Sequence, residues 1–446
     1  MTLSAVHRFL PVLALALAAS TAAAQGVDFR QSVELALKQN PQLAVTRSRI
    51  EQAQAALREA EAGRLPRLNL SLTATHTNDP LAAFGLKLAQ ERITAADFNP
   101  VRLNDPKSIN NLNTRVELLW PLYTGGQVDS ALAQARALIE AAQAGDAAAR
   151  QQLIEQVLAA YQGVHAARAQ VRVAEQSVAA AEEHVRVAQR LHQQGMALKS
   201  DVLSARVQLE EARLRLAEAN NGVAAALDRL KLVTGRALDE PLEVGPPVMP
   251  TLLAGSEQEL RRQALTAHAE IAALRRQIEA AAAAAAAARA ARRPQVSLML
   301  RQDWNDKGIG LDASSQTAAA VLNWTAFDGE ATRARVDRAE AARLELTARL
   351  RQAEDAIGAQ VAEARRRALE AEARVSAREL AVELAEESLR LVRKRYENAM
   401  GTMLELVSAQ AQLDRARSEL VVARYELVLQ RAALMRAVGV LEADRI

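Results

Sequence analysis

Two acidic side chains, Asp201 and Glu405, lie at positions where a carboxylate could cap a helix or bind a cation. Each follows a short turn between two long helix-favouring segments, and 204 positions separate them. An acid near a helix start is stabilised by the helix dipole, and its oxygens can accept hydrogen bonds from unpaired N–H groups. Thr402 and Glu405 fit such a capping box, and Asp201 follows Ser200. Carboxylates around a narrow opening would also favour cations and could bind divalent ions. Both roles stay open, and they can hold together.

The sequence contains no motif that predicts catalysis. It has no cysteine, no phosphate-binding glycine loop, no His-Glu-x-x-His and no Gly-x-Ser-x-Gly. The methionines near the two turns, Met196, Met400 and Met403, have no neighbouring His or Cys, so they do not predict a soft-metal site. We therefore expect no enzymatic activity, no cofactor and no metal. The lack of Cys also excludes disulfides and the lipid-accepting cysteine of a bacterial lipoprotein.

The composition is apolar yet poor in aromatic residues. Of 446 residues, 50% are apolar and only 3% are aromatic, and Ala, Leu and Val dominate the apolar set. The 56 basic and 53 acidic residues leave a net charge of +3. So small a charge does not create the strong field that attracts nucleic acid, and we expect no nucleic-acid partner.

The first residues are typical of an export signal. His7 and Arg8 precede an apolar run at 9–19, and the small residues up to Ala24 form a signal peptidase site. We predict a signal peptide at 1–24. No later stretch is long and uncharged enough for a membrane-spanning helix.

The mature chain is an internal duplication, because one offset of 204 residues pairs its halves over more than a hundred positions. The pairs include Trp120 and Trp324, Tyr123 and Phe327, Gly125 and Gly329, Met196 and Met400, Ser204 and Ser408, and Gly235 and Gly439. The predicted domains are a first repeat at 25–236, a linker at 237–255, a second repeat at 256–441 and a tail at 442–446. The first repeat has 24 extra residues, around 78–111, which predict an enlarged loop.

Each repeat has two segments in which apolar and polar residues alternate, as in a strand with one dry face. The four predicted strands cover about 66–77, 112–123, 294–304 and 317–327. Their length suits a tilted strand that crosses a bilayer, and aromatic residues gather at their ends and loops. A four-stranded sheet packed on helices is the alternative. Because four strands cannot close a barrel in lipid, a barrel would have to be shared between chains.

Long helices fill the rest of each repeat. Helices are predicted at about 29–62, with a break at Pro41, and at about 256–292. A proline-free helix from Gln127 to Gln194 would span roughly 100 Å at 1.5 Å per residue. Small residues recur along it in steps of three and four from Val157, which predicts a coiled-coil seam. Such a length suits a tube between two membranes.

Together with the duplication and the signal peptide, the turn at 121–126 and the motif that starts at Arg395-Tyr396 and continues through Gly401 resemble the TolC-like outer membrane efflux protein (outer membrane factor) family. The resemblance implies a mainly α fold with a small membrane β part. A homotrimer would build a 12-stranded β-barrel, four strands per chain, continued by an α-helical coiled-coil barrel. It also implies an outer-membrane location extending into the periplasm, contact with outer-membrane lipid, and two partners: a periplasmic adaptor and an inner-membrane transporter of resistance-nodulation-division or ABC type.

The family's periplasmic gate maps onto the two turns. The resemblance assigns Asp201 and Glu405 to carboxylate rings and Tyr396 to the hydrogen-bond network of the gate. A further acid of the family corresponds to Ser408, and an arginine of the family corresponds to Gly401. The resemblance therefore implies that the closed gate of this protein is held less tightly.

Seven residues of the turns are candidates for docking the adaptor, although they could also just close the turns. They are Gly195, Met196, Ala197, Leu198, Met400, Gly401 and Met403. The expected function is the outer-membrane exit duct of a tripartite efflux or type I secretion system. A periplasmic coiled-coil adaptor or a helical scaffold without a pore is the alternative.

Overall fold

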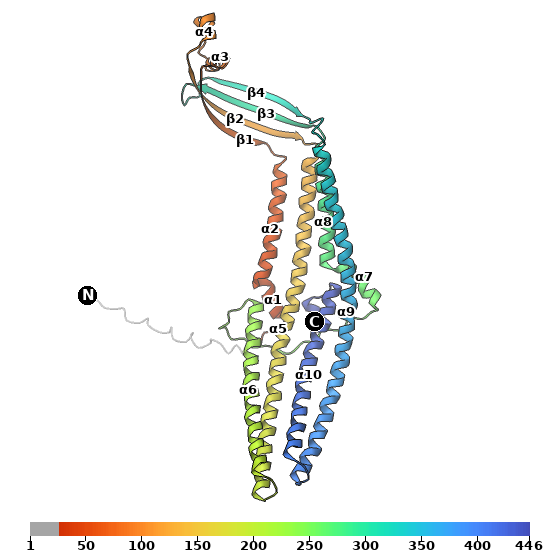
Figure 1. Ribbon diagram of the computed structural model, residues 1–446. Coiled ribbons are helices and arrows are strands. Elements are labelled where there is room, and N and C mark those ends of the chain that lie inside the picture. The colour runs from red at the N-terminus through yellow and green to blue at the C-terminus, as the bar shows by residue number, and fades with distance from the viewer. Residues whose placement is uncertain (1–25) are drawn as a thin grey trace, which may run out of the picture. The chain divides into compact units, whose positions relative to one another are not determined.

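The computed structural model describes residues 26–446, and the predicted signal peptide lies outside them. The described chain consists mainly of helices, with one four-stranded sheet (Figure 1). It divides into two compact units, each drawn from both halves of the sequence. One unit comprises 26–44, 148–268 and 357–446, and the other comprises 45–147 and 269–356. Three helices contribute residues to both units: α2 (Pro41–Ala62), α5 (Gln127–Gln193) and α9 (Ala331–Glu397).

The sheet belongs to the second unit, and its strands run antiparallel in sequence order. They are β1 (Arg67–Thr77), β2 (Ile109–Tyr123), β3 (Gln295–Asp306) and β4 (Ser314–Asn323). The prediction of four strands per chain is confirmed. The fourth strand ends at Asn323, so Trp324 and Phe327, which the prediction placed at the end of this strand, follow it.

Alternation along the strands gives the sheet two unlike faces. One cross-strand row joins Leu68, Leu118, Leu300 and Ala318. A second row, three positions along the strands and therefore on the opposite face, joins Ser71, Arg115, Asp303 and Ser315. The apolar face is open along β1, where Leu68, Leu70 and Leu72 are 69%, 75% and 61% exposed. Helices therefore do not cover the apolar face of this sheet, and the alternative of a sheet packed on helices is wrong.

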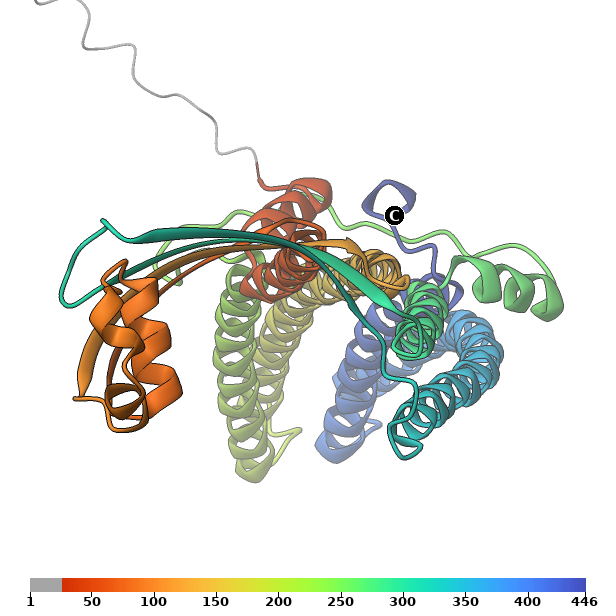
Figure 2. The ribbon, with the colours of Figure 1, turned by 90° about the horizontal axis from the view of Figure 1, so that it is seen from above.

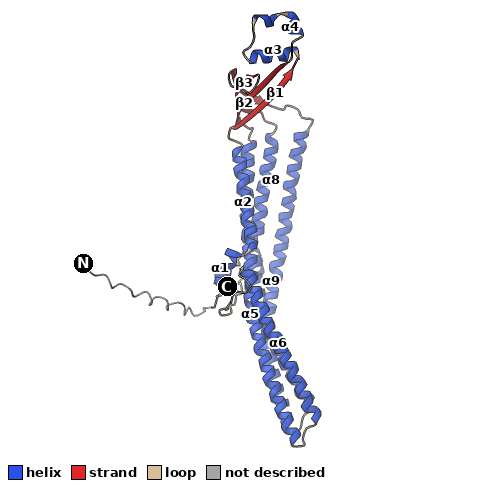
Figure 3. Ribbon diagram, turned by 90° about the vertical axis from the view of Figure 1, so that its left-hand side faces the viewer, coloured by secondary structure: helices blue, strands red, loops and turns tan. Residues whose placement is uncertain are grey.

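The connection between β1 and β2 is not the enlarged loop that its prolines predict. It folds into α3 (Pro80–Ala89), a 3-10 turn (Ala95–Phe98) and α4 (Pro100–Asn104), which lie beyond the strand ends in Figure 3. Asp79 and Asn99 cap the two helices through their side-chain oxygens, and a proline stands at the first helical position of each. Proline at that position favours a helix start, because its missing N–H would have no partner there.

Most of α2 and all of α8 (Ala269–Ala290) belong to the second unit, where they accompany the first parts of α5 and α9. Arg276 of α8 pairs with Glu140 of α5 at 2.9 Å, and Arg289 of α8 pairs with Glu340 of α9. These ion pairs connect α8 to both long helices.

The first unit contains two helical hairpins. The first joins α5 to α6 (Lys199–Thr234), and the second joins α9 to α10 (Met403–Val438). The predicted seam is buried at Val157, Ala160 and Val164. Both long helices have 67 residues and both return helices have 36, so the hairpins match in length.

Short helices α1 (Phe29–Gln39) and α7 (Glu257–Ala267) complete this unit, with a 3-10 turn at Ala443–Arg445. The prediction of an unbroken helix over 256–292 is wrong, because His268 is extended and separates α7 from α8. The cause is packing between distant segments. Gly439 ends α10 in the left-handed conformation, and a Cβ there would lie 3.0 Å from the Ala267 carbonyl oxygen. Gly235 ends α6 in the same way against Gln39.

Among residues 26–446, none of the helices combines the length and the apolar character needed to span a membrane.

Candidate functional site

The turns of the two hairpins have nearly the same backbone structure. The N–H of Met196 donates to the Leu191 carbonyl at 2.8 Å, and the N–H of Met400 donates to the Arg395 carbonyl at 2.8 Å. Each turn has one left-handed residue, Gly195 in the first and Ala399 in the second. The duplication therefore extends to the geometry of the turns, which are drawn at the ends of the α5–α6 and α9–α10 hairpins in Figure 1.

A single buried cluster joins the two hairpins just behind the turns. It contains Leu191 of α5, Val202 of α6, Tyr396 of α9, and Met403 and Leu406 of α10, together with further apolar residues. Because all four helices contribute, the packing fixes the starts of α6 and α10 relative to each other.

Glu405 has the capping role that its position predicts. Its N–H donates to Thr402 Oγ1 at 3.2 Å, and its carboxylate accepts the Thr402 N–H at 3.5 Å. The Arg395 guanidinium lies 3.7 Å from the same carboxylate. The capping box is confirmed, and the carboxylate remains exposed.

Asp201 occupies the equivalent position of the first hairpin. Its carboxylate accepts the Leu198 N–H at 3.3 Å, but Leu198 has no side-chain oxygen that could complete the box. The side chain is half-buried. Asp201 therefore makes only one of the two hydrogen bonds of a capping box. Most of the hydrogen-bonding capacity of its carboxylate stays available.

Tyr396 lies in the buried cluster and is 3% exposed. Its hydroxyl has no hydrogen-bond partner within the described chain. Burial raises the pKa of Tyr396, and the negative charge of Asp201 raises it further, so the hydroxyl stays protonated and can only act as a neutral donor or acceptor. The structure thus places Tyr396 within the electrostatic influence of Asp201.

The two other positions onto which gate residues of the family map lie near Glu405, Ser408 on α10 and Gly401 in the turn before it. Ser408 is exposed one turn after Glu405. Gly401 lies where a Cβ would be 3.3 Å from the Glu405 carboxylate and 3.4 Å from the Arg395 Cβ. Arg395, in the last turn of α9, places a positive charge beside the same carboxylate. Its position in the motif at Arg395-Tyr396 does not by itself predict this contact, although basic residues in the last turn of a helix are favourable there.

The turn residues differ in exposure, and one prediction among them is wrong. Met196, Leu198 and Met400 are 53%, 71% and 66% exposed, as docking would need. Met403 is 5% exposed and belongs to the buried cluster, because it continues the apolar seam of α10 three residues before Leu406. Leu404, which was not predicted, is 75% exposed.

A cavity of about 270 Å³ lies between the two hairpins, further from the turns. Ser177 donates to Asp414 at 2.6 Å, and Gln410 donates to the same carboxylate at 2.8 Å. His184 also lines it, and burial lowers the pKa of this imidazole to about 4, with the nearby charge of Arg393 adding to the effect. No cluster of three or more His, Asp or Glu side chains suited to a metal ion occurs between residues 26 and 446.

Comparison with known proteins places this geometry in a family. Residues 32–236 and 260–440 match the model of the family described as "Outer membrane efflux protein". The chain is 33% identical over 420 residues to Protein CyaE of Bordetella pertussis, covering 92% of this chain and 84% of that protein.

Solved structures agree with this fold. The outer membrane protein VceC of Vibrio cholerae superposes with a TM-score of 0.75 at 21% identity, covering 92% of this chain and 96% of VceC. The MtrE outer membrane channel of Neisseria gonorrhoeae, in its open state, gives a TM-score of 0.72 at 19% identity, covering 95% of this chain and 91% of MtrE. The fold is that of trimeric channels with a barrel and a helical tube. The chain therefore belongs to the outer membrane efflux protein family and forms an exit duct of the outer membrane that extends into the periplasm, for efflux or type I secretion.

Proposed function

We propose that the two hairpin turns form the gated periplasmic end of this duct. The observation that carries the proposal is the equivalent placement of two acids, Asp201 and Glu405, at the starts of α6 and α10 behind one shared cluster. In a trimer these helix starts bring six carboxylates around one bore. A narrow ring of carboxylates attracts cations and slows their passage.

Tyr396 and Ser408 complete the proposed gate. The Tyr396 hydroxyl has no partner among residues 26–446, and it lies close enough to Asp201 to feel its charge. A buried hydroxyl without a partner is costly, so a bond to a neighbouring copy in the closed trimer would stabilise that state. Ser408 occupies the position of the third acid that the resemblance implies, and it carries no charge. The proposed gate therefore relies on two acids per chain.

Family membership implies a trimer that associates with an adaptor and an inner-membrane pump. We propose that the exposed apolar residues of the turns receive the adaptor, with Met196, Leu198 and Met400 as the principal contacts. Gly195, Ala197 and Gly401 would shape the turns that present them. Solvent-exposed apolar groups at the ends of two matched hairpins are typical of a docking surface.

The pump is proposed to be a resistance-nodulation-division or ABC transporter, and the four-stranded sheet is proposed to contact outer-membrane lipid.

Single-channel recording in planar lipid bilayers tests the gate. The double variant Asp201→Asn with Glu405→Gln keeps the side-chain shapes and removes the charges. We expect a higher conductance and weaker block by multivalent cations than in the wild type. The matched control is Asp228→Asn with Glu426→Gln, which removes the same two charges from the C-terminal halves of α6 and α10. If the double variant and the control conduct and block alike, the carboxylate gate is wrong.

A further inference from the structure

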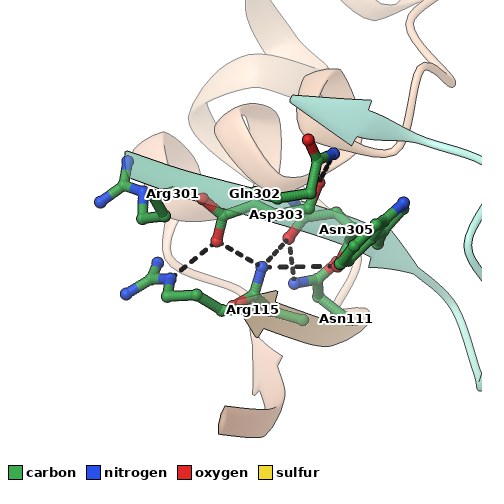
Figure 4. A network of polar contacts seen from close by, with 8 residues as sticks. Asn111, Arg115, Arg301, Gln302, Asp303 and Asn305 are labelled. Atoms are coloured by element: carbon green, nitrogen blue, oxygen red, sulfur yellow. Dashed lines mark hydrogen bonds and ion pairs between the residues drawn. The ribbon is translucent and has the colours of Figure 1, made fainter. Parts of the chain in front are cut away.

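A charged cluster lies on the polar face of the sheet (Figure 4). Asp303 of β3 faces Arg115 of β2, and its carboxylate is 7% exposed. Arg115 Nε donates to Oδ1 at 2.8 Å, and Arg301 Nε lies 2.8 Å from Oδ2 without hydrogen-bond geometry, so this second contact is mainly Coulombic. Asn113 adds a bond to Oδ1 at 3.1 Å. Both carboxylate oxygens are therefore occupied.

The cluster continues as a row of amides toward the β1–β2 connection. Asn113 and Asn111 both donate to Asn305 Oδ1, at 3.1 and 3.0 Å. Gln90, at the end of α3, then donates to Asn111 Oδ1 at 2.9 Å and to the Asn110 carbonyl at 2.8 Å. Gln90 and Asn111 are both buried. A continuous set of hydrogen bonds thus runs from the sheet to the connection.

Gln90 also accepts a hydrogen bond from a residue of the β1–β2 connection. Arg92 Nη1 donates to Gln90 Oε1 at 2.7 Å. The connection is a small folded unit, because Lys87 pairs with Asp97 and the rings of Phe84 and Phe98 meet edge to face at 5.8 Å. The Gln90 amide is therefore the point where a compact element is attached to the polar face.

The chemistry of the two faces indicates that the polar one would line the channel. Arginine and aspartate side chains on a lipid-facing surface are destabilising, whereas the exposed Leu68, Leu70 and Leu72 of the opposite face suit lipid. Asn111, Asn113 and Arg115 share the parity of the polar face, so Gln90 attaches the connection on the channel side. Figure 2 shows α3 and α4 (orange) on the concave side of the curved sheet.

We propose that the β1–β2 connection, residues 78–108, narrows the outer end of the channel, and that Gln90 is the positioning residue that holds it there. The proposal rests on the channel function above. The connection joins the strand ends opposite to those from which α2, α5, α8 and α9 depart, so it lies at the outer mouth of the barrel. Its four acidic and four basic residues cancel, which indicates that it restricts passage by size rather than by charge.

The internal duplication supports this assignment independently. The equivalent connection of the second repeat, between β3 and β4, spans only residues 307–313 and has no helix. The outer ends of the two strand pairs thus differ in their connections: only the connection between β1 and β2 contains helices. In a trimer, three such connections would project over one lumen.

The test combines amide hydrogen exchange with bilayer recordings on the full-length trimer. Gln90→Leu removes every hydrogen bond of the amide at nearly constant volume, and Gln90→Glu places a carboxylate against the Asn111 oxygen. Gln52→Leu, at an exposed position of α2, is the matched control. In both Gln90 variants we expect exchange of peptides within 80–104 to accelerate by about tenfold or more, since a buried hydrogen-bond network is lost. We also expect larger conductance, with the control unchanged in both readouts.

The outcomes separate the two proposals. A wild-type trimer that fails to conduct would overturn the channel function and this inference with it. A conducting wild type whose Gln90 variants exchange faster but conduct alike would show that the connection lies outside the conduction path. Unchanged exchange would show that Gln90 does not hold it. Should Gln90→Leu not assemble as a trimer, Gln90→Glu, which keeps a polar side chain, decides between these results.

Discussion

The Arg395 guanidinium lies 3.7 Å from the Glu405 carboxylate, and the first hairpin has no counterpart of this pair. The residue 204 positions before Arg395 is Leu191, which is buried in the cluster behind the turns. Within residues 26–446, Asp201 forms no ion pair and only accepts a backbone N–H. The two proposed gate acids are therefore unequal in their contacts: Glu405 lies beside a guanidinium, and Asp201 has no ion-pair partner among the described residues.

Replacing Arg395 by Gln should make Glu405 behave like Asp201. We expect stronger block by multivalent cations, because a carboxylate without a guanidinium partner binds cations better. The stability of the trimer should change by less than about 1 kcal/mol, since the pair is solvent-exposed. Bilayer recordings with increasing cation concentration measure the block, and thermal unfolding measures the stability.

The control for Arg395→Gln is Arg390→Gln, which breaks the pair with Glu387 on the same helix away from the turn. Equal block in the two variants would contradict a specific role for Arg395.

The buried His184 should make the packing between the hairpins sensitive to acid. Its pKa is lowered from the usual 6.5 to about 4, chiefly by burial. Between these values the unfolded chain binds a proton that the folded chain does not, so the free energy of unfolding falls as the pH drops from about 6.5 to 4. The total loss is on the order of 3 kcal/mol. Thermal unfolding across this pH range should show the decrease in the wild type and a smaller one in His184→Leu.

His192→Gln, a change at an exposed position near the turn, serves as the control. The prediction fails if His184→Leu loses as much stability between pH 6.5 and 4 as this control does.

The glycines that end the return helices should resist substitution. Gly235 and Gly439 have φ values of 77° and 81°, and a Cβ at either would lie 3.0 Å from a neighbouring segment. Ala at either position should destabilise the fold by about 1–3 kcal/mol, through left-handed strain and contact with Gln39 or Ala267. Gly222→Ala, inside α6 with open space around it, should instead stabilise the helix by up to about 1 kcal/mol. Thermal denaturation of the three variants should show this change of sign, and a uniform effect would contradict it.

The sequence predicts the elements of this fold well because their signals are local. Period-two alternation around Leu70 and the seam from Val157 specify strands and a long helix without any knowledge of the partners. The break at His268 has no such signal, since it depends on Gly439 packing against Ala267 from the far end of the chain. The helices between β1 and β2 could have been predicted, because Asp79-Pro80 and Asn99-Pro100 are helix-start patterns. The Arg395–Glu405 pair spans a turn whose geometry only the structure provides.

Met400 and Met403 lie three residues apart, and the structure assigns them different roles. Met403 is buried in the cluster, so Met403→Ala should destabilise the trimer by about 2–5 kcal/mol through the cavity it leaves. Met400 is exposed, so Met400→Ala should alter stability by less than about 0.5 kcal/mol but weaken adaptor docking. Thermal unfolding of the purified trimers measures the first effect. Susceptibility of a deletion strain to drugs and metals, complemented with each variant at equal protein level, measures the second. If Met400→Ala complements as fully as the wild type, and so does the added change Leu198→Ala, the exposed turn residues do not form the docking surface.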